Sequence, residues 1–170
     1  MIRDAVSDDA PALASISAHP VLHGIASYES EAPSEDEKPT RLDPVREARC
    51  PWLIAELGGS VFGFTYATQM RDRPGYRHTA EDSVYVAAEY ARRGIGRALL
   101  AELIARTEAS GFRQLIAVIG GAEPASIALH AALGFRQVGR IEAAGRKHGR
   151  WLDSVCMQRA LGAGSGSDPA

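Results

Sequence analysis

A turn rich in arginine and glycine carries the clearest chemical signal in the chain. It holds three basic residues and two glycines around one isoleucine: Arg92, Arg93, Gly94, Ile95, Gly96 and Arg97. An apolar run, residues 83–86, precedes it and a strongly helical segment follows. The first N–H groups of a helix lack intrahelical partners and lie at the positive end of its dipole, so they bind phosphate oxygens. Glycines there let a ligand approach the backbone. The turn therefore predicts a pyrophosphate site.

Two common phosphate motifs do not fit this turn. A dinucleotide fingerprint would need glycine where the chain has Leu99, and no Gly-Lys-Ser/Thr triplet is present. The spacing instead resembles motif A of the GNAT N-acetyltransferases, Arg/Gln-x-x-Gly-x-Gly/Ala, with Ala91 at its first position. The alternative reading is an ordinary tight turn followed by a solvated, basic helix start.

Length and composition indicate one globular domain. The chain has 170 residues, 45% of them hydrophobic, and a net charge of −2, which suits one core rather than two. Nucleic-acid binders usually carry a basic surplus, so we expect no nucleic-acid partner. Cys50 and Cys156 lack metal-ligand spacing, so we expect no metal. No apolar run approaches the roughly 20 residues of a membrane span, and no signal segment is evident. We expect a cytoplasmic protein without membrane contact.

The order of predicted elements favours an α+β fold. Strands are predicted over residues 2–6, 52–57, 61–68, 83–87, 115–119, 135–141 and 151–159. Helices are predicted after Ser7 or Asp8, from Ser34, over 94–110 and over 123–133, with a loop over 19–33. This order predicts a mixed sheet with helices on its faces. Residues 1–161 form the predicted domain, and residues 162–170 a flexible C-terminal tail.

Three further segments narrow the resemblance. Residues 71–86, 126–135 and 143–153 are similar to blocks of the phosphinothricin and methionine sulfone (methionine sulfoximine) N-acetyltransferases, and residues 27–29 and 51–56 add weaker matches. The resemblance implies the GNAT fold, a mostly antiparallel twisted sheet flanked by helices. It also implies acetyl-CoA as co-substrate, direct attack by the α-amine of a small amino acid in a ternary complex, and a homodimer.

The resemblance also suggests catalytic roles. Acetyl transfer to an amine requires a neutral nitrogen, a polarised thioester and a proton for the departing thiolate. Glu81 stands where the family has its general base; the alternatives are an anchor for the substrate ammonium or a partner of an arginine. His130 stands where a proton donor to the thiolate is found; the alternative is a half-buried histidine bonded to a carbonyl. Tyr85 is a second candidate donor, unless it only packs in its strand.

Cofactor contacts are expected beyond the arginine-glycine turn. In the family the strand opens near Val84, Tyr85 and Val86, whose backbone groups pair with the pantetheine amides. Ser126 lies in the second helix block, and Glu123 stands where this group usually has an asparagine that contacts CoA.

Substrate contacts are expected from three segments. Arginine forks bind carboxylate, sulfone or phosphinate oxygens in pairs, although a solvated basic loop is the alternative. The candidate substrate residues are Tyr28, Glu29, Arg71, Arg73, Tyr76, Thr79 and Lys147. Two other functions stay open: acetylation of another small amine, and a non-catalytic acyl-CoA-binding sensor.

Overall fold

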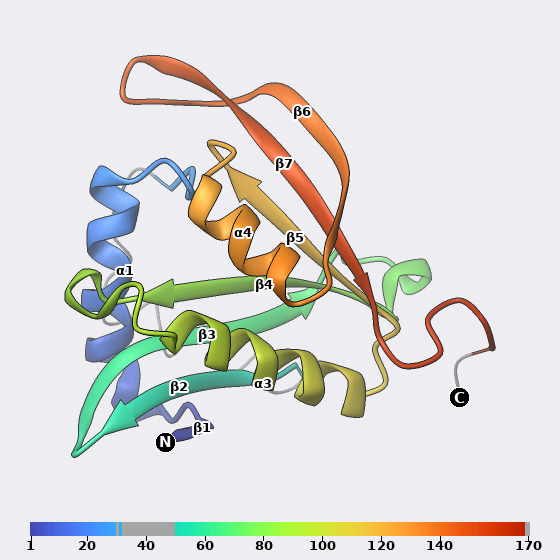
Figure 1. Ribbon diagram of the computed structural model, residues 1–170, viewed down its shortest axis with the longest axis horizontal. Helices are drawn as coiled ribbons and strands as arrows, with labels where there is room; N and C mark the ends of the chain where they lie inside the picture. The colour runs from blue at the N-terminus through green and yellow to red at the C-terminus, as the bar shows by residue number, and fades with distance from the viewer. Residues whose placement is uncertain (30, 32–49, 169–170) are drawn as a thin grey trace.

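The computed structural model describes residues 1–29, 31 and 50–168. Within these residues, seven strands form one sheet in the order β1-β2-β3-β4-β5-β7-β6 (Figure 1). The strands are β1 (Ile2–Asp4), β2 (Trp52–Leu57), β3 (Ser60–Gln69), β4 (Thr79–Val86), β5 (Gln114–Gly120), β6 (Arg136–Lys147) and β7 (Arg150–Ala160). The helices are α1 (Ala10–His23), α3 (Ile95–Ala109) and α4 (Pro124–Ala132), with short 3-10 turns η1 (Ser7–Asp9), η2 (Pro74–Tyr76) and η3 (Ala88–Tyr90).

The sheet is mixed and mostly antiparallel, as predicted. Within the described residues only β4 and β5 run parallel, and they pair only where Thr79–Glu81 meets Gln114–Ile116. Beyond these pairs the two strands diverge toward their carboxyl ends (Figure 1). The divergence leaves one edge of β4 without a strand partner in the middle of the sheet.

Alternation along β4 assigns its side chains to two faces. A Cβ on Gly96 of α3 would meet Val86 and Leu129 at 3.4 and 3.6 Å and Val84 at 3.9 Å, so the two valines face the side that α3 and α4 cover. Tyr85 points to the opposite face, where its ring stacks on Phe64 of β3 at 4.7 Å between centroids. Glu81 shares this second face with Tyr85.

The structure corrects several predicted boundaries. Helix α1 continues through Pro20 to His23, although a loop was predicted from residue 19. Proline lacks the N–H of a helix bond, but Val21, fully buried after it, keeps the last turn packed. Strand β4 begins at Thr79 rather than at residue 83, because Ala80 pairs with Gln69 and is buried.

Strand β6 also differs from its prediction, since it reaches Lys147 rather than residue 141. Its exposed side chains carry no apolar alternation, and its pairing with β7 slips between Ile141 and Gly145. The helix predicted from Ser34 lies outside the described residues. After β7, Leu161 is buried and the N–H of Gly164 donates to its carbonyl; the flexibility of the tail stays a prediction.

None of the helices that the structure describes is long and apolar enough to cross a membrane. Likewise, no group of three His, Cys, Asp or Glu side chains in residues 1–29, 31 and 50–168 could hold a metal ion.

Candidate active site

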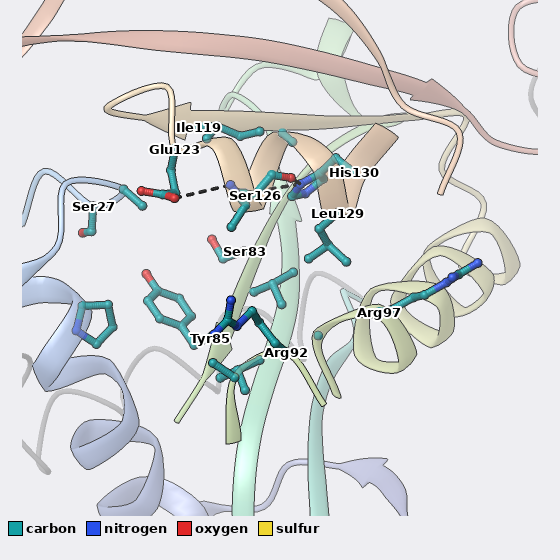
Figure 2. Close-up of a pocket in the computed structure, with 18 of the residues that line it drawn as sticks. Ser27, Ser83, Tyr85, Arg92, Arg97, Ile119, Glu123, Ser126, Leu129 and His130 are labelled. Carbon is teal, nitrogen blue, oxygen red and sulfur yellow. Dashed lines mark hydrogen bonds between the residues drawn. The ribbon is translucent and has the colours of Figure 1, made fainter. Parts of the chain in front are cut away.

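A cavity of about 560 Å³ lies where β4 and β5 diverge. Its lining comes from the end of α1 and the loop after it, the second half of β4, the arginine-glycine turn, β5 and α4 (Figure 2). The residues predicted from sequence that line it are Val84, Tyr85, Val86, Arg92, Gly94, Gly96, Arg97, Glu123, Ser126 and His130. The structure therefore brings most of the predicted cofactor residues together around one space.

The start of α3 has the features of a phosphate site. Gly94 is the N-cap residue with φ 83°, and no side chain caps the helix, so the N–H groups of the first turn face outward without a capping partner. Arg92 also has a positive φ, 59°, and it lines the cavity (Figure 2). These groups fit a pyrophosphate.

The structure separates the three arginines of this turn. Arg92 and Arg97 line the cavity, but Arg93 does not; its guanidinium carbon lies 5.3 Å from the centre of the Tyr90 ring. Ile95 packs against the hydrophobic core instead of lining the cavity. The predicted roles of Arg93 and Ile95 in binding the cofactor stay predictions that the cavity does not support.

The middle of the cavity is bounded by the free edge of β4. Val84, Tyr85 and Val86 pair with β3 on one side, while the ladder to β5 ends at Glu81. Backbone groups on the free edge of a strand are available to a ligand. A pantetheine chain could therefore add to this edge as a short strand would.

Glu81 lies at the last β4–β5 pair, just outside the cavity lining. It belongs to strand β4, although the predicted strand began only at residue 83. Burial is the main cause that raises the pKa of its carboxyl group above 4.5; the Arg71 charge lowers this pKa and the Asp82 charge raises it. A raised pKa suits a general base, and Ser83, two residues along the same face, does line the cavity.

His130 is held by protein groups on both ring nitrogens. Its Nδ1 lies 2.7 Å from the carbonyl oxygen of Ser126, and its Nε2 lies 3.0 Å from Oδ2 of Asp82. Both side chains are buried, with 4% and 1% exposed. Burial opposes protonation of His130, but the hydrogen bond and charge of Asp82 raise its pKa above 6.5. Burial raises the pKa of Asp82, because it disfavours the charged carboxylate, whereas the hydrogen bond with His130 lowers this pKa.

The start of α4 contributes the carboxylate of Glu123 to the cavity lining. The Glu123 carboxylate accepts from the N–H of Ala125 at 3.3 Å and so caps the helix. Figure 2 shows the oxygen atoms of Glu123, Ser27, Ser83 and Tyr85 turned toward one part of the cavity. This part is polar, whereas the end of the cavity at the start of α3, which Arg92 and Arg97 line, is cationic.

The loop after α1 is held in place from several sides. The hydroxyl of Tyr28 lies 3.0 Å from Ser154 Oγ and donates to the carbonyl of Asp153 at 3.1 Å, and a Cβ on Gly145 would lie 2.7 Å from its ring. The Lys147 ammonium donates to the carbonyls of Val21 and Ser27 at 2.6 and 2.7 Å.

These contacts tie the loop after α1 to β6 and β7. Tyr28 and Lys147 do not line the cavity, and neither does Glu29, whose charge acts on Lys147. Among the described residues, the contacts of Tyr28 and Lys147 therefore position the loop after α1. Contact of these two residues and of Glu29 with the substrate stays a prediction.

The remaining predicted substrate residues lie at the amino end of β4. Arg71, Arg73 and Tyr76 are exposed in the loop before it, which Gln69 holds through the carbonyls of Arg71 and Arg73. Thr79 pairs with Gln114 at the start of the parallel ladder. None of these four residues lines the cavity.

Comparisons with known proteins identify the family of this chain. The family model described as "Acetyltransferase (GNAT) domain" matches residues 2–156. This chain belongs to the GNAT acetyltransferase family. Phosphinothricin N-acetyltransferase of Alcaligenes faecalis is 46% identical over 170 residues, which cover 99% of this chain and 85% of the relative.

Two more relatives of this GNAT acetyltransferase support the resemblance seen in its sequence. L-methionine sulfoximine/L-methionine sulfone acetyltransferase of Salmonella typhimurium is 34% identical over 160 residues, 94% of each chain. The crystal structure of a phosphinothricin acetyltransferase from Sinorhizobium meliloti in complex with AcCoA has a TM-score of 0.97 and 47% identity, covering 100% of this chain and 92% of that chain. The predicted family and fold are confirmed.

Sequence reasoning missed several residues at this GNAT site. Asp82 received no role, although its carboxylate contacts His130. Gly120 and Gly121 received no role either, but a Cβ on Gly120 would lie 2.6 Å from Ala26, and one on Gly121 2.6 Å from Ile25, both in the loop after α1. The paired glycines after an apolar strand were the one available signal for this close approach.

Proposed function

We propose that this protein transfers the acetyl group of acetyl-CoA to the α-amine of a small amino acid with a tetrahedral side-chain head, such as phosphinothricin, methionine sulfone or methionine sulfoximine. The single observation that carries this proposal is the cavity between the diverging strands, which joins the uncapped start of α3 to the polar groups near Ser83. The similar proteins named above supply the class of substrate.

The reaction proposed is direct attack in a ternary complex. The amine nitrogen bonds to the acetyl carbon, the carbon–sulfur bond breaks, and the thiolate takes a proton. Glu81 is the proposed base for the amine, acting through water because it lies outside the lining. Neither Cys50 nor Cys156 lines the cavity in the described structure, which supports direct transfer over a cysteine-bound intermediate.

Release of CoA thiol tests the proposed function. The panel contains phosphinothricin, methionine sulfone, methionine sulfoximine, ordinary amino acids and polyamines, each with acetyl-CoA. Turnover confined to the tetrahedral-headed amino acids supports the proposal. Turnover only with other amines would contradict the substrate class while leaving the acetyltransferase chemistry in place. Acetyl-CoA binding without turnover on any amine would favour a non-catalytic sensor.

A homodimer is also part of this proposal. The β6–β7 hairpin exposes Ile141 by 53% and Trp151 by 66%, and large apolar side chains left exposed on one hairpin favour a partner surface. Sedimentation equilibrium measures the mass directly. A mass of one chain across the concentration range would contradict the dimer.

A further inference from the structure

Asp82, His130 and Ser126 form a continuous hydrogen-bonded chain from the core to the cavity. Asp82 comes from β4, and the other two residues from adjacent turns of α4. Asp82 Oδ2 lies 3.0 Å from His130 Nε2, and His130 Nδ1 lies 3.4 Å from Ser126 Oγ. Ser126 and His130 line the cavity, whereas Asp82 lies behind them. This series of hydrogen bonds therefore has one buried end, at Asp82, and one end open to a ligand, at Ser126.

The carbonyl of Ser126 fixes where the protons lie in this chain. A carbonyl oxygen only accepts, so His130 Nδ1, 2.7 Å from it, carries a hydrogen. The same N–H is the donor toward Ser126 Oγ, 3.4 Å away. The hydroxyl hydrogen of Ser126 is then not needed for this contact and is available to a group in the cavity.

The contact between His130 and Asp82 must hold one further proton. With Nδ1 already protonated, the Nε2–Oδ2 hydrogen bond requires either a neutral ring accepting from a carboxylic acid or an imidazolium donating to a carboxylate. Oδ1 of Asp82 has no hydrogen-bond partner among the described residues, so no neighbouring side chain competes with His130 for this carboxyl group. The pair is built to retain a proton.

Other groups around His130 favour the same state. The ring lies in the last turn of α4, where the helix dipole stabilises a cation. The ring of Phe135 contacts it edge-on at 4.9 Å between centroids and carries no charge. Asp82 is the charged side chain that acts on His130, and its charge also acts on Glu81, the preceding residue of β4, whose side chain lies on the opposite face.

We propose that these three residues form a proton relay for the leaving thiolate. Ser126 is the donor in the cavity, and Asp82 is a positioning residue that acts through His130. As the carbon–sulfur bond breaks, the Ser126 hydroxyl gives its proton to sulfur and takes the Nδ1 proton of His130. Solvent then returns a proton to the ring, since an unprotonated Nδ1 would face the Ser126 carbonyl. This inference rests on the proposed acetyl transfer.

The variants Asp82→Asn and Ser126→Ala test the relay. An asparagine N–H can still bond to Nε2, but it does not stabilise an imidazolium, so the ring pKa measured by ¹⁵N NMR should fall below 6.5. Ser126→Ala should leave that pKa unchanged. Both variants should lower kcat about tenfold or more with KM for acetyl-CoA within about twofold. Because both act in one step, the double variant should lose little more than either single one.

Two exposed positions far from the cavity provide matched controls. Asp4→Asn and Ser110→Ala make the same chemical changes and should leave kcat unchanged. Unchanged kcat in Ser126→Ala, or an unchanged His130 pKa in Asp82→Asn, would overturn the relay. Failure of the proposed function is seen separately, as no turnover of any amine by the unsubstituted protein, and would overturn both proposals.

Discussion

The ammonium of Lys147 donates to the carbonyl oxygen of Ser27 at 2.7 Å, across 120 residues of sequence. The same ammonium donates a second hydrogen bond, to the carbonyl oxygen of Val21 at 2.6 Å, in the last turn of α1. Ser27 and Ala26 line the cavity. One lysine on the β6–β7 hairpin thus positions a wall of the site without lining the cavity itself.

Replacing Lys147 with methionine should weaken both the fold and acceptor binding. Methionine keeps the apolar stem but leaves two carbonyls without their donor, which costs about 1–3 kcal/mol for an unpaired buried group. The free energy of unfolding should fall by that amount in urea titration. The KM for the amine should rise more than the KM for acetyl-CoA, because the loop after α1 lies away from the phosphate end.

Arg146→Met is the control for this change, since Arg146 is exposed on the same strand. If Lys147→Met matched Arg146→Met in both stability and KM, Lys147 would not hold the loop.

Arg92→Gln should weaken the binding of acetyl-CoA through its phosphates. Arg92 lines the cavity at the start of α3, and one lost hydrogen bond to a charged group corresponds to a roughly tenfold rise in KM. The KM for S-acetylpantetheine, which lacks the pyrophosphate, should not change. Steady-state kinetics with both donors separates a phosphate contact from a general loss of fit.

Arg93→Gln is the matched control, because Arg93 stacks on Tyr90 outside the cavity. An equal loss in Arg93→Gln, or an equal loss with S-acetylpantetheine, would contradict the assigned phosphate end.

Glu81→Gln should lower kcat about 100-fold or more while acetyl-CoA binding, measured by calorimetry, stays the same. A base must be ionised to accept a proton, and burial raises the pKa of Glu81 above 4.5. Activity of the unsubstituted enzyme should therefore fall as the pH drops through that raised pKa, and Glu81→Gln should lack this acidic limb.

Glu89→Gln, at an exposed position of η3, controls for the lost charge. A normal kcat with a raised KM for the amine would instead make Glu81 an ammonium anchor, and no change in either constant would exclude both roles.

Local features of this protein could be predicted from the sequence alone. The arginine-glycine turn depends on residues close in the chain, where two glycines follow a strand and open a helix, so a helix starting near Gly94 was predicted; Gly94 is its N-cap residue. The glycine pair at residues 58–59, between the predicted strands 52–57 and 61–68, likewise favours a tight turn, and β2 and β3 pair across it as a hairpin. The family resemblance then supplied the order of the remaining elements.

Contacts between distant positions could not be predicted in this way. Asp82 and His130 lie 48 residues apart, and neither residue type nor spacing indicates that one will bury its charge against the other. The exposed end of β6 has no apolar alternation to mark it as a strand. Lys147 was assigned to the substrate on the family resemblance alone, whereas pairing of β6 with β7 brings its ammonium to two carbonyls.

The most direct test of the proposed substrate compares kcat/KM within two matched pairs of amines. Phosphinothricin is measured against glutamate, and methionine sulfone against methionine, with acetyl-CoA held constant. A site built to bond tetrahedral head-group oxygens should prefer the first member of each pair by at least about 100-fold. Equal rates within both pairs, or a preference for glutamate and methionine, would contradict the account.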